Sequence, residues 1–85
     1  MKEFKFTVKD ELGIHARPAG KLVKEAACFE SEITIENRGK TGDAKRIFSV
    51  MGLGVRCADV ITVRIEGKDE DEAKERILAF LEENL

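Results

Sequence analysis

The spacing of the apolar residues changes several times along this chain, and this change constrains the fold more than any other feature. In residues 4–9, apolar and polar side chains alternate, which is the period of a strand with one buried face. From Ala16 onward the apolar residues recur three and four positions apart, as on one face of a helix: Ala19, Leu22, Val23 and Ala26. A chain that switches between the two periods is expected to pack helices against a sheet.

The same two periods divide the rest of the chain into five more elements. Alternation predicts strands at residues 32–36 and 61–66, and the turn at 37–40 leads into a short strand at 40–43. Helical spacing predicts a short helix from Ile47 that ends by Gly52 or Gly54, and a last helix over about 70–83. Asp69 and Glu72 are typical of a capping box before this last helix, whose stripe comprises Ala73, Ile77, Phe80, Leu81 and Asn84.

The predicted order is therefore β-α-β-β-α-β-α, in the α+β class. Because the strand faces alternate, the four-stranded sheet should be antiparallel or mixed, with one face in water. The three helices must cover the other face, where their apolar stripes can be buried. The chain has no linker, repeat or low-complexity tract, so we expect a single domain over residues 1–85.

Charge and composition exclude several classes of function. The net charge of -2 argues against bulk binding to nucleic acid or to a membrane surface, which usually needs a basic surplus. No signal peptide and no apolar run of about 18 residues is present, so we expect a cytoplasmic protein without membrane insertion. Cys28 and Cys57 form no metal-ligand spacing and are predicted to be buried or half-buried free thiols.

The segment 13–19, Gly-Ile-His-Ala-Arg-Pro-Ala, lies where a loop enters the first helix. Most helices start with Ser, Thr, Asp or Asn, whose side-chain oxygen accepts a hydrogen bond from a free backbone N–H. Here His15 or Ala16 takes that place, and Pro18 belongs in the first turn, where its missing N–H costs nothing. The free N–H groups can therefore donate hydrogen bonds to an external anion, and the helix dipole would stabilise its negative charge.

His15 is the only histidine, and it stands at this helix start. Neutral imidazole can attack phosphorus, and a helix N-terminus disfavours the imidazolium. The helix start and the guanidinium of Arg17 could then meet the charge of a bound phosphoryl group. A lone histidine in a loop is more often a plain surface residue, so the residues alone leave both interpretations open and name no phosphoryl donor.

Residues 13–19 resemble the active-site signature of HPr, the histidine-containing phosphocarrier family of the phosphoenolpyruvate-dependent sugar phosphotransferase system. Residues 47–54 resemble the second helix of that family, and the similarity covers essentially the whole chain. The resemblance implies an open-faced β-sandwich with an antiparallel sheet. It implies that Enzyme I phosphorylates His15 on Nδ1, that Arg17 supports the phosphoryl group, and that the A domains of sugar permeases accept it. Such a protein is a co-substrate rather than an enzyme, and it uses no cofactor or metal.

The resemblance also implies a docking face for these partners. The matching residues are Ile47, Phe48 and Met51, with a basic rim of Arg17, Lys21 and Lys24. The plain alternative is that residues 47–51 belong to the core. A helix this short cannot bury all its apolar side chains, so we expect Phe48 and Met51 to be at least partly exposed. Interfaces formed by such a carrier should be small and transient, and the chain is expected to be a monomer.

Arg46 departs from the family pattern, because many members carry a regulatory serine there. We therefore expect no regulatory phosphorylation at Arg46, and we interpret Ser49 as a small helix residue. The pair Leu12-Gly13 also occurs in the nitrogen-type branch, which leaves a regulatory phosphorelay as an alternative. An HPr-like interaction module without transfer is a second alternative. The element order β-α-β-β-α-β also occurs in RNA-recognition domains, which need exposed aromatic side chains on the sheet and a basic surface. Here Phe4 and Phe6 share the inward face with Val8 and the net charge is negative, which argues against RNA binding.

Overall fold

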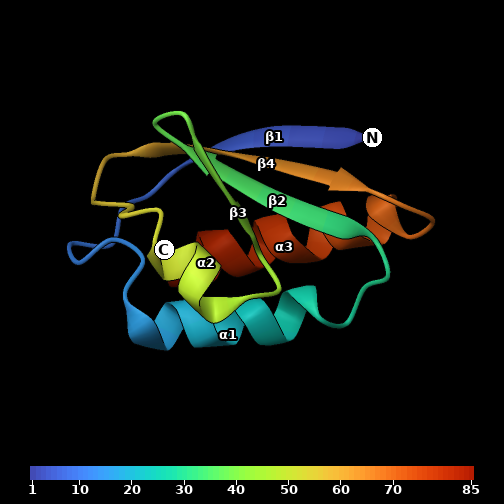
Figure 1. Ribbon diagram of the computed structural model, residues 1–85, viewed down its shortest axis with the longest axis horizontal. Helices are drawn as coiled ribbons and strands as arrows, with labels where there is room; N and C mark the ends of the chain where they lie inside the picture. Colours follow the sequence, from blue (N-terminus) through green and yellow to red (C-terminus); the bar gives the residue numbers. More distant parts are fainter.

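The computed structural model describes all of residues 1–85 and contains the seven elements in the predicted order (Figure 1). The strands are β1 (Lys2–Thr7), β2 (Glu32–Asn37), β3 (Lys40–Asp43) and β4 (Val60–Glu66). The helices are α1 (Ala16–Ala26), α2 (Ile47–Met51) and α3 (Glu70–Asn84). No helix has the length and apolar character needed to cross a membrane.

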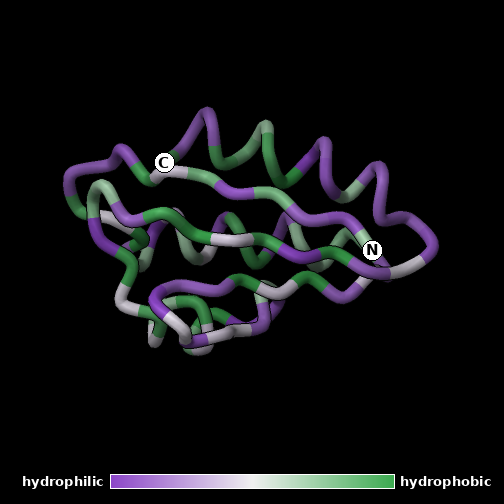
Figure 2. The backbone as a smooth tube through the Cα atoms, turned by 90° about the horizontal axis from the view of Figure 1, so that it is seen from above, coloured by the Kyte–Doolittle hydropathy of each residue, from purple (hydrophilic) through white to green (hydrophobic).

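The four strands form one antiparallel sheet in the order β1-β4-β2-β3. Val63 at the centre of β4 pairs with Phe4 of β1 on one side and with Ile35 of β2 on the other. One face of the sheet is covered by the helices and the other is open, as predicted (Figure 1). The hydropathy of the backbone alternates along both the strands and the helices, which is the pattern that such a layered packing requires (Figure 2).

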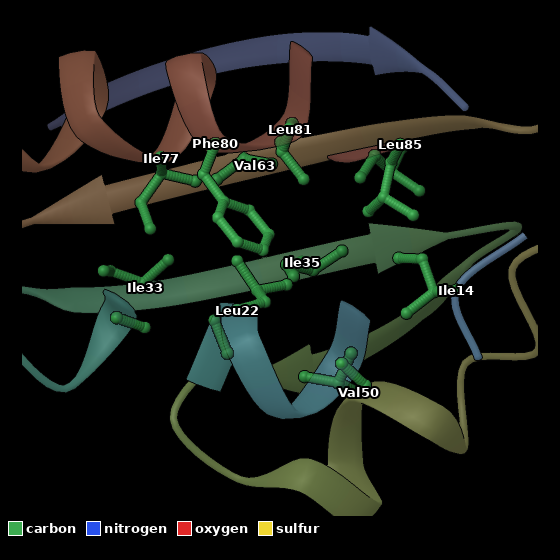
Figure 3. Close-up of a cluster of buried hydrophobic side chains, with 14 of the residues drawn as sticks. Ile14, Leu22, Ile33, Ile35, Val50, Val63, Ile77, Phe80, Leu81 and Leu85 are labelled. Carbon is green, nitrogen blue, oxygen red and sulfur yellow. The ribbon is translucent and has the colours of Figure 1, made fainter. Parts of the chain in front are cut away.

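The core lies between the sheet and the helices. Ile33 and Ile35 of β2 meet Leu22 of α1 and Ile77 of α3, and all four side chains are almost fully buried (Figure 3). The core contains 20 buried apolar residues in one cluster, so the helices cover the sheet without a second core. Phe4 and Phe6 are half-buried and pack against this cluster, so the prediction that they face inward is confirmed.

The predicted capping box at the start of α3 is wrong. Asp69 occupies the N-cap position, but its side chain forms no capping hydrogen bond. Its carboxylate instead accepts hydrogen bonds from the backbone N–H of Glu30 at 2.8 Å, from that of Ser31 at 3.0 Å, and from the Ser31 hydroxyl. A carboxylate can satisfy several donors at once, and the loop before β2 offers three of them. The carboxylate of Asp69 therefore joins the start of α3 to the loop before β2 and does not cap the helix.

Both cysteines are free, as predicted, but the prediction that they are buried is wrong. Cys28 follows the last turn of α1 and its thiol lies 3.5 Å from the carbonyl oxygen of Lys24. Cys57 lies in the loop before β4, with its thiol 3.6 Å from the carbonyl oxygen of Lys9. Both positions fall outside the apolar stripes of the helices and strands, so neither thiol reaches the core.

Candidate functional site

His15 is the N-cap residue of α1 and takes an extended backbone conformation there. Its side chain forms no capping hydrogen bond, and the first turn of α1 contains no acidic residue. The expectation that this helix start lacks a local side-chain acceptor is therefore confirmed. The His15 side chain is 38% exposed, so the imidazole can be reached by another protein.

One pocket joins His15 to the start of α1, the preceding loop and the end of α3. Its lining residues are Asp10, His15, Arg17, Pro18, Lys21 and Asn84. The structure thus brings together most of the site residues predicted near the helix start, while Ala16 is exposed at the first helical position. Two cationic side chains, Arg17 and Lys21, line the same pocket as His15, which makes the pocket suitable for an anion.

Asn84 and Asp10 line this pocket, although neither was predicted as a site residue. Asn84 was assigned to the apolar stripe of α3, but it is only half-buried, and its amide donates to the carbonyl oxygen of Phe80 at 2.9 Å. The chain packs the end of α3 beside the start of α1, and no local pattern indicates this neighbourhood. For Asp10 a local signal exists, because an Asp two residues before a free N–H is typical of an Asx turn.

Asp10 closes such a turn and also faces the histidine. Its Oδ1 accepts a hydrogen bond from the backbone N–H of Leu12 at 2.8 Å. Its Oδ2 lies 3.8 Å from Nε2 of His15, which is within the range of an ion pair and beyond a direct hydrogen bond. The carboxylate is therefore held at the Nε2 edge of the ring.

The loop between β1 and α1 is held by two distant segments. The backbone N–H groups of Lys9 and Asp10 donate to the carbonyl oxygen of Leu85 at 2.6 and 2.8 Å. Farther along, the N–H of Ile14 donates to the carbonyl oxygen of Val55 at 3.2 Å. Ile14 and Leu85 are both buried at the same end of the core (Figure 3). The position of His15 therefore depends on packing across the whole domain.

Residues 53–59, which include the Val55 carbonyl that supports Ile14, are held in place by the buried carboxylate of Asp59. Asp59 accepts hydrogen bonds from the backbone N–H of Arg56 at 2.9 Å and from the Arg38 guanidinium at 2.7 Å. Asn37 donates its amide to the Leu53 carbonyl at the other end of this segment, at 3.1 Å. The N–H of Arg56 and the guanidinium of Arg38 hold the pKa of Asp59 below its ordinary value. Asp59 is thus charged at neutral pH and ties this segment to the end of β2.

The short helix α2 presents an apolar surface to solvent. Phe48 is 85% exposed and Met51 is 38% exposed, whereas Val50 is fully buried. The expectation that Phe48 and Met51 are at least partly exposed is confirmed. The alternative, that the apolar residues of this helix belong to the core, holds in full only for Val50. Ile47 is half-buried and packs against the core cluster. We define Ile47, Phe48 and Met51 as the α2 patch.

The predicted basic rim is divided between two places. Arg17 and Lys21 line the His15 pocket, and Lys21 also borders a groove between α1 and α3. Lys24 lines that groove with Cys28 and Arg76 and does not reach the His15 pocket. The two lysines therefore follow the α3 side of α1.

Arg46 and Ser49 flank the start of α2 in different ways. Arg46 is the N-cap residue but contributes no capping hydrogen bond, and its Nε lies 4.0 Å from a carboxylate oxygen of Asp43. The Ser49 hydroxyl accepts a hydrogen bond from the backbone N–H of Asp43 at 2.9 Å. Ser49 is therefore more than a small helix residue, because it links α2 to the end of β3.

Comparison with known proteins identifies the family. The family model described as "PTS HPr component phosphorylation site" matches residues 2–83. The chain is 46% identical to the phosphocarrier protein HPr of Mycoplasma genitalium over 85 residues, which are 99% of this chain and 97% of the relative. It is 45% identical over 82 residues to the HPr-like protein Crh of Halalkalibacterium halodurans, covering 96% of this chain and 98% of the relative.

A solved structure agrees with this result. HPr-C-His from Thermoanaerobacter tengcongensis superimposes with a TM-score of 0.92 at 39% identity, covering 96% of this chain and 92% of the other. The open-faced arrangement of four antiparallel strands and three helices is thus the fold of HPr structures. Since sequence and fold agree over nearly the full length, this chain belongs to the HPr family of phosphocarrier proteins of the phosphotransferase system.

Proposed function

We propose that this protein accepts a phosphoryl group from phosphorylated Enzyme I on Nδ1 of His15 and transfers it to the A domain of a sugar permease. The observation that carries the proposal is the accessible His15 at the uncapped start of α1, in one pocket with Arg17 and Lys21. The protein acts as a co-substrate, and its single domain spans residues 1–85.

The electrostatics of the pocket suit a transient phosphoryl group. A phosphoryl group on histidine carries about two negative charges. The free N–H groups at the start of α1 can donate to its oxygens, and the helix dipole stabilises the charge. Arg17 is exposed and can approach the group from solvent as a bidentate donor. These contacts stabilise the phosphorylated form without enclosing it, so a partner can still reach the phosphorus.

The α2 patch is the docking surface in this proposal. An exposed Phe and a Met adapt to several partners, because their side chains bury a large area or change shape easily. Arg17 and Lys21 line the His15 pocket, Lys24 lies farther along α1 on the side of α3, and Arg46 adds a positive charge at the start of α2. A partner that fits this surface has an apolar centre with acidic residues around it.

Two other functions remain candidates on specific observations. The pair Leu12-Gly13 favours a nitrogen-type regulatory relay, in which the same His15 chemistry serves a different donor and acceptor. The similarity to a relative named HPr-like protein Crh makes an HPr-like interaction module without transfer the second candidate. A module of that kind needs neither an accessible His15 nor the cations beside it, so phosphoryl transfer is the better account.

The decisive test is phosphorylation with phosphoenolpyruvate and a purified Enzyme I, measured by mass spectrometry. We expect a gain of one phosphate that is lost in acid, and no gain in His15→Ala. Enzyme I of the sugar-type and nitrogen-type systems should be compared, because the faster donor identifies the branch. No gain with either donor would overturn the carrier function and favour the interaction module.

Replacing Phe48 by alanine should weaken docking without unfolding the protein. Because Phe48 is 85% exposed, its loss should change the free energy of unfolding by less than about 0.5 kcal/mol. The KM for phosphorylated Enzyme I should rise about tenfold, as for a central aromatic contact, while kcat changes little. Val60→Ala is a matched control, because Val60 is 51% exposed and lies on the open face of the sheet. Equal KM values for the two variants would exclude Phe48 from the docking surface.

A further inference from the structure

Asp10 is the only carboxylate that lines the His15 pocket. The other lining residues beside His15 are cationic or neutral: Arg17, Pro18, Lys21 and Asn84. The Oδ2 atom of Asp10 lies 3.8 Å from Nε2 of His15, and the Asp10 side chain is 29% exposed. The negative charge is therefore directed at one particular nitrogen of the ring.

The carboxylate of Asp10 is fixed from several sides. Its Oδ1 accepts from the N–H of Leu12 at 2.8 Å, which leaves Oδ2 free for the histidine. Its backbone N–H donates to the carbonyl oxygen of Leu85 at 2.8 Å, and its carbonyl oxygen accepts from the N–H of Gly13 at 2.9 Å. A carboxylate held in this way does not have to be ordered again when the ring changes charge.

We propose that Asp10 is a positioning residue for phosphoryl transfer: it keeps the ring proton of His15 on Nε2 and leaves the lone pair on Nδ1. This proposal rests on the proposed function, because it assigns a role in the same transfer. The physical reason is that the two ring nitrogens are distinct, and a carboxylate beside one of them stabilises the proton at that nitrogen.

The proton stays in place through both transfers. When the group is accepted, the lone pair of Nδ1 forms the N–P bond while the bond from phosphorus to the donor breaks and its electron pair remains on the donor. The ring keeps its Nε2–H and becomes positively charged, and Asp10 offsets that charge. When the group is delivered, a lone pair of the acceptor protein forms a new bond to phosphorus while the N–P bond breaks and its electron pair returns to Nδ1. The product is again the neutral ring with its proton on Nε2, so no proton has to move.

Nitrogen-15 NMR of the His15 ring tests this assignment without any phosphoryl chemistry. At a pH well above the ordinary range of imidazole titration, we expect the native protein to hold the Nε2–H tautomer. Asp10→Asn keeps an oxygen for the N–H of Leu12 but places the amide NH₂ toward Nε2, which favours the Nδ1–H tautomer. Glu11→Gln is the matched control, because Glu11 is exposed, forms no ion pair and carries the same charge one residue away.

Transfer kinetics provide the second measurement. Asp10→Asn should lower kcat for phosphoryl acceptance about three- to tenfold, the size expected for a partly exposed charge that also sets a tautomer, with KM unchanged. Asp10→Ser keeps the turn through its hydroxyl but removes the carboxylate. Its kcat should therefore lie between those of the native protein and Asp10→Asn. Thermal unfolding of each variant separates a folding defect from this effect.

The outcomes distinguish this proposal from the proposed function. A tautomer ratio that is the same in the native protein, Asp10→Asn and Glu11→Gln would overturn the role of Asp10. A changed ratio without a fall in kcat would overturn it as well. By contrast, a native protein that gains no phosphate from any Enzyme I overturns the carrier function, whatever the tautomer of His15.

Discussion

Replacing Gly13 by alanine is expected to displace the loop that carries His15 and to remove most of the phosphoryl acceptance. Gly13 has a φ of 67°, in the left-handed region that side chains with a Cβ rarely adopt. A Cβ at this position would overlap with the carbonyl oxygen of Val55 and would lie 2.8 Å from the Cα of Arg56. Both atoms belong to the backbone, so no side-chain rotation can relieve the clash.

The loop must therefore move away from the segment before β4. That movement breaks the hydrogen bond from Ile14 to Val55 and removes Ile14 from the core. We expect the free energy of unfolding to fall by about 2–4 kcal/mol, from backbone strain and lost packing together. A shift of about 1 Å at a reacting group can cost a factor of about 100 in rate, so kcat for phosphoryl acceptance should fall by a similar factor. Urea unfolding and single-turnover phosphorylation measure the two effects.

Gly39→Ala is the control for the conformational part of this effect. Gly39 also has a positive φ, 83°, but a Cβ there would meet no atom within 4 Å. Its replacement should lower the free energy of unfolding by about 1 kcal/mol, because alanine disfavours the left-handed conformation. Phosphoryl transfer should be unchanged. If Gly13→Ala were no more damaging than Gly39→Ala, the contact between the His15 loop and Val55 would not determine the site.

The elements of this fold could be predicted from the sequence because each one shows its own period. Residues 32–36 alternate cleanly, and the structure places Ile33 and Ile35 in the core with the intervening residues outside. The helix from Ala16 was predicted from a stripe in which the structure buries Ala19, Leu22 and Ala26 and half-buries Val23. The exposure of Phe48 also follows from local reasoning, because five helical residues cannot all face the core.

The candidate site could be predicted only where its residues are neighbours in the chain. His15, Arg17 and Pro18 belong to one short segment, and one pocket brings them together. Asn84 comes to this pocket through the packing of the end of α3 beside the loop, which no spacing in the sequence indicates. Asp10 lies in the same loop as His15, and its only local signal is the Asx turn that it closes.

The error at Asp69 has the same origin as these omissions. The residue has the position of an N-cap, and the local rule assigns its carboxylate to the helix. The fold brings the segment before β2 close enough for its N–H groups to compete for the same oxygens. Short-range rules fail where a distant segment offers more donors, and the replacement of Asp69 should therefore have effects beyond α3.

Asp69→Ala is expected to lower the stability of the whole domain by removing the acceptor for three hydrogen bonds. Ser31 is 1% exposed, so its N–H and hydroxyl would be left without a partner in a place that water does not reach. The midpoint of thermal unfolding at neutral pH should fall by roughly 10 °C, since small domains are sensitive to such losses. Asp71→Ala is the matched control: Asp71 is in the first turn of the same helix and is 81% exposed. Its ion pair with Lys2 is a surface contact, which stabilises little.

The pH dependence separates the carboxylate of Asp69 from a general loss of packing. The hydroxyl of Ser31 and the backbone N–H of Glu30 hold the pKa of Asp69 below its ordinary value in the folded protein. Its contribution is therefore complete above the pKa of the unfolded chain, about 4, and is lost as the pH falls through the lower pKa of the folded state. The native protein should lose stability in acid more steeply than Asp69→Ala, so the two unfolding curves should approach each other as the pH falls below the pKa of the unfolded chain. Parallel pH profiles would show instead that the damage in the variant comes from packing, and that the charge of Asp69 does not hold β2 to α3.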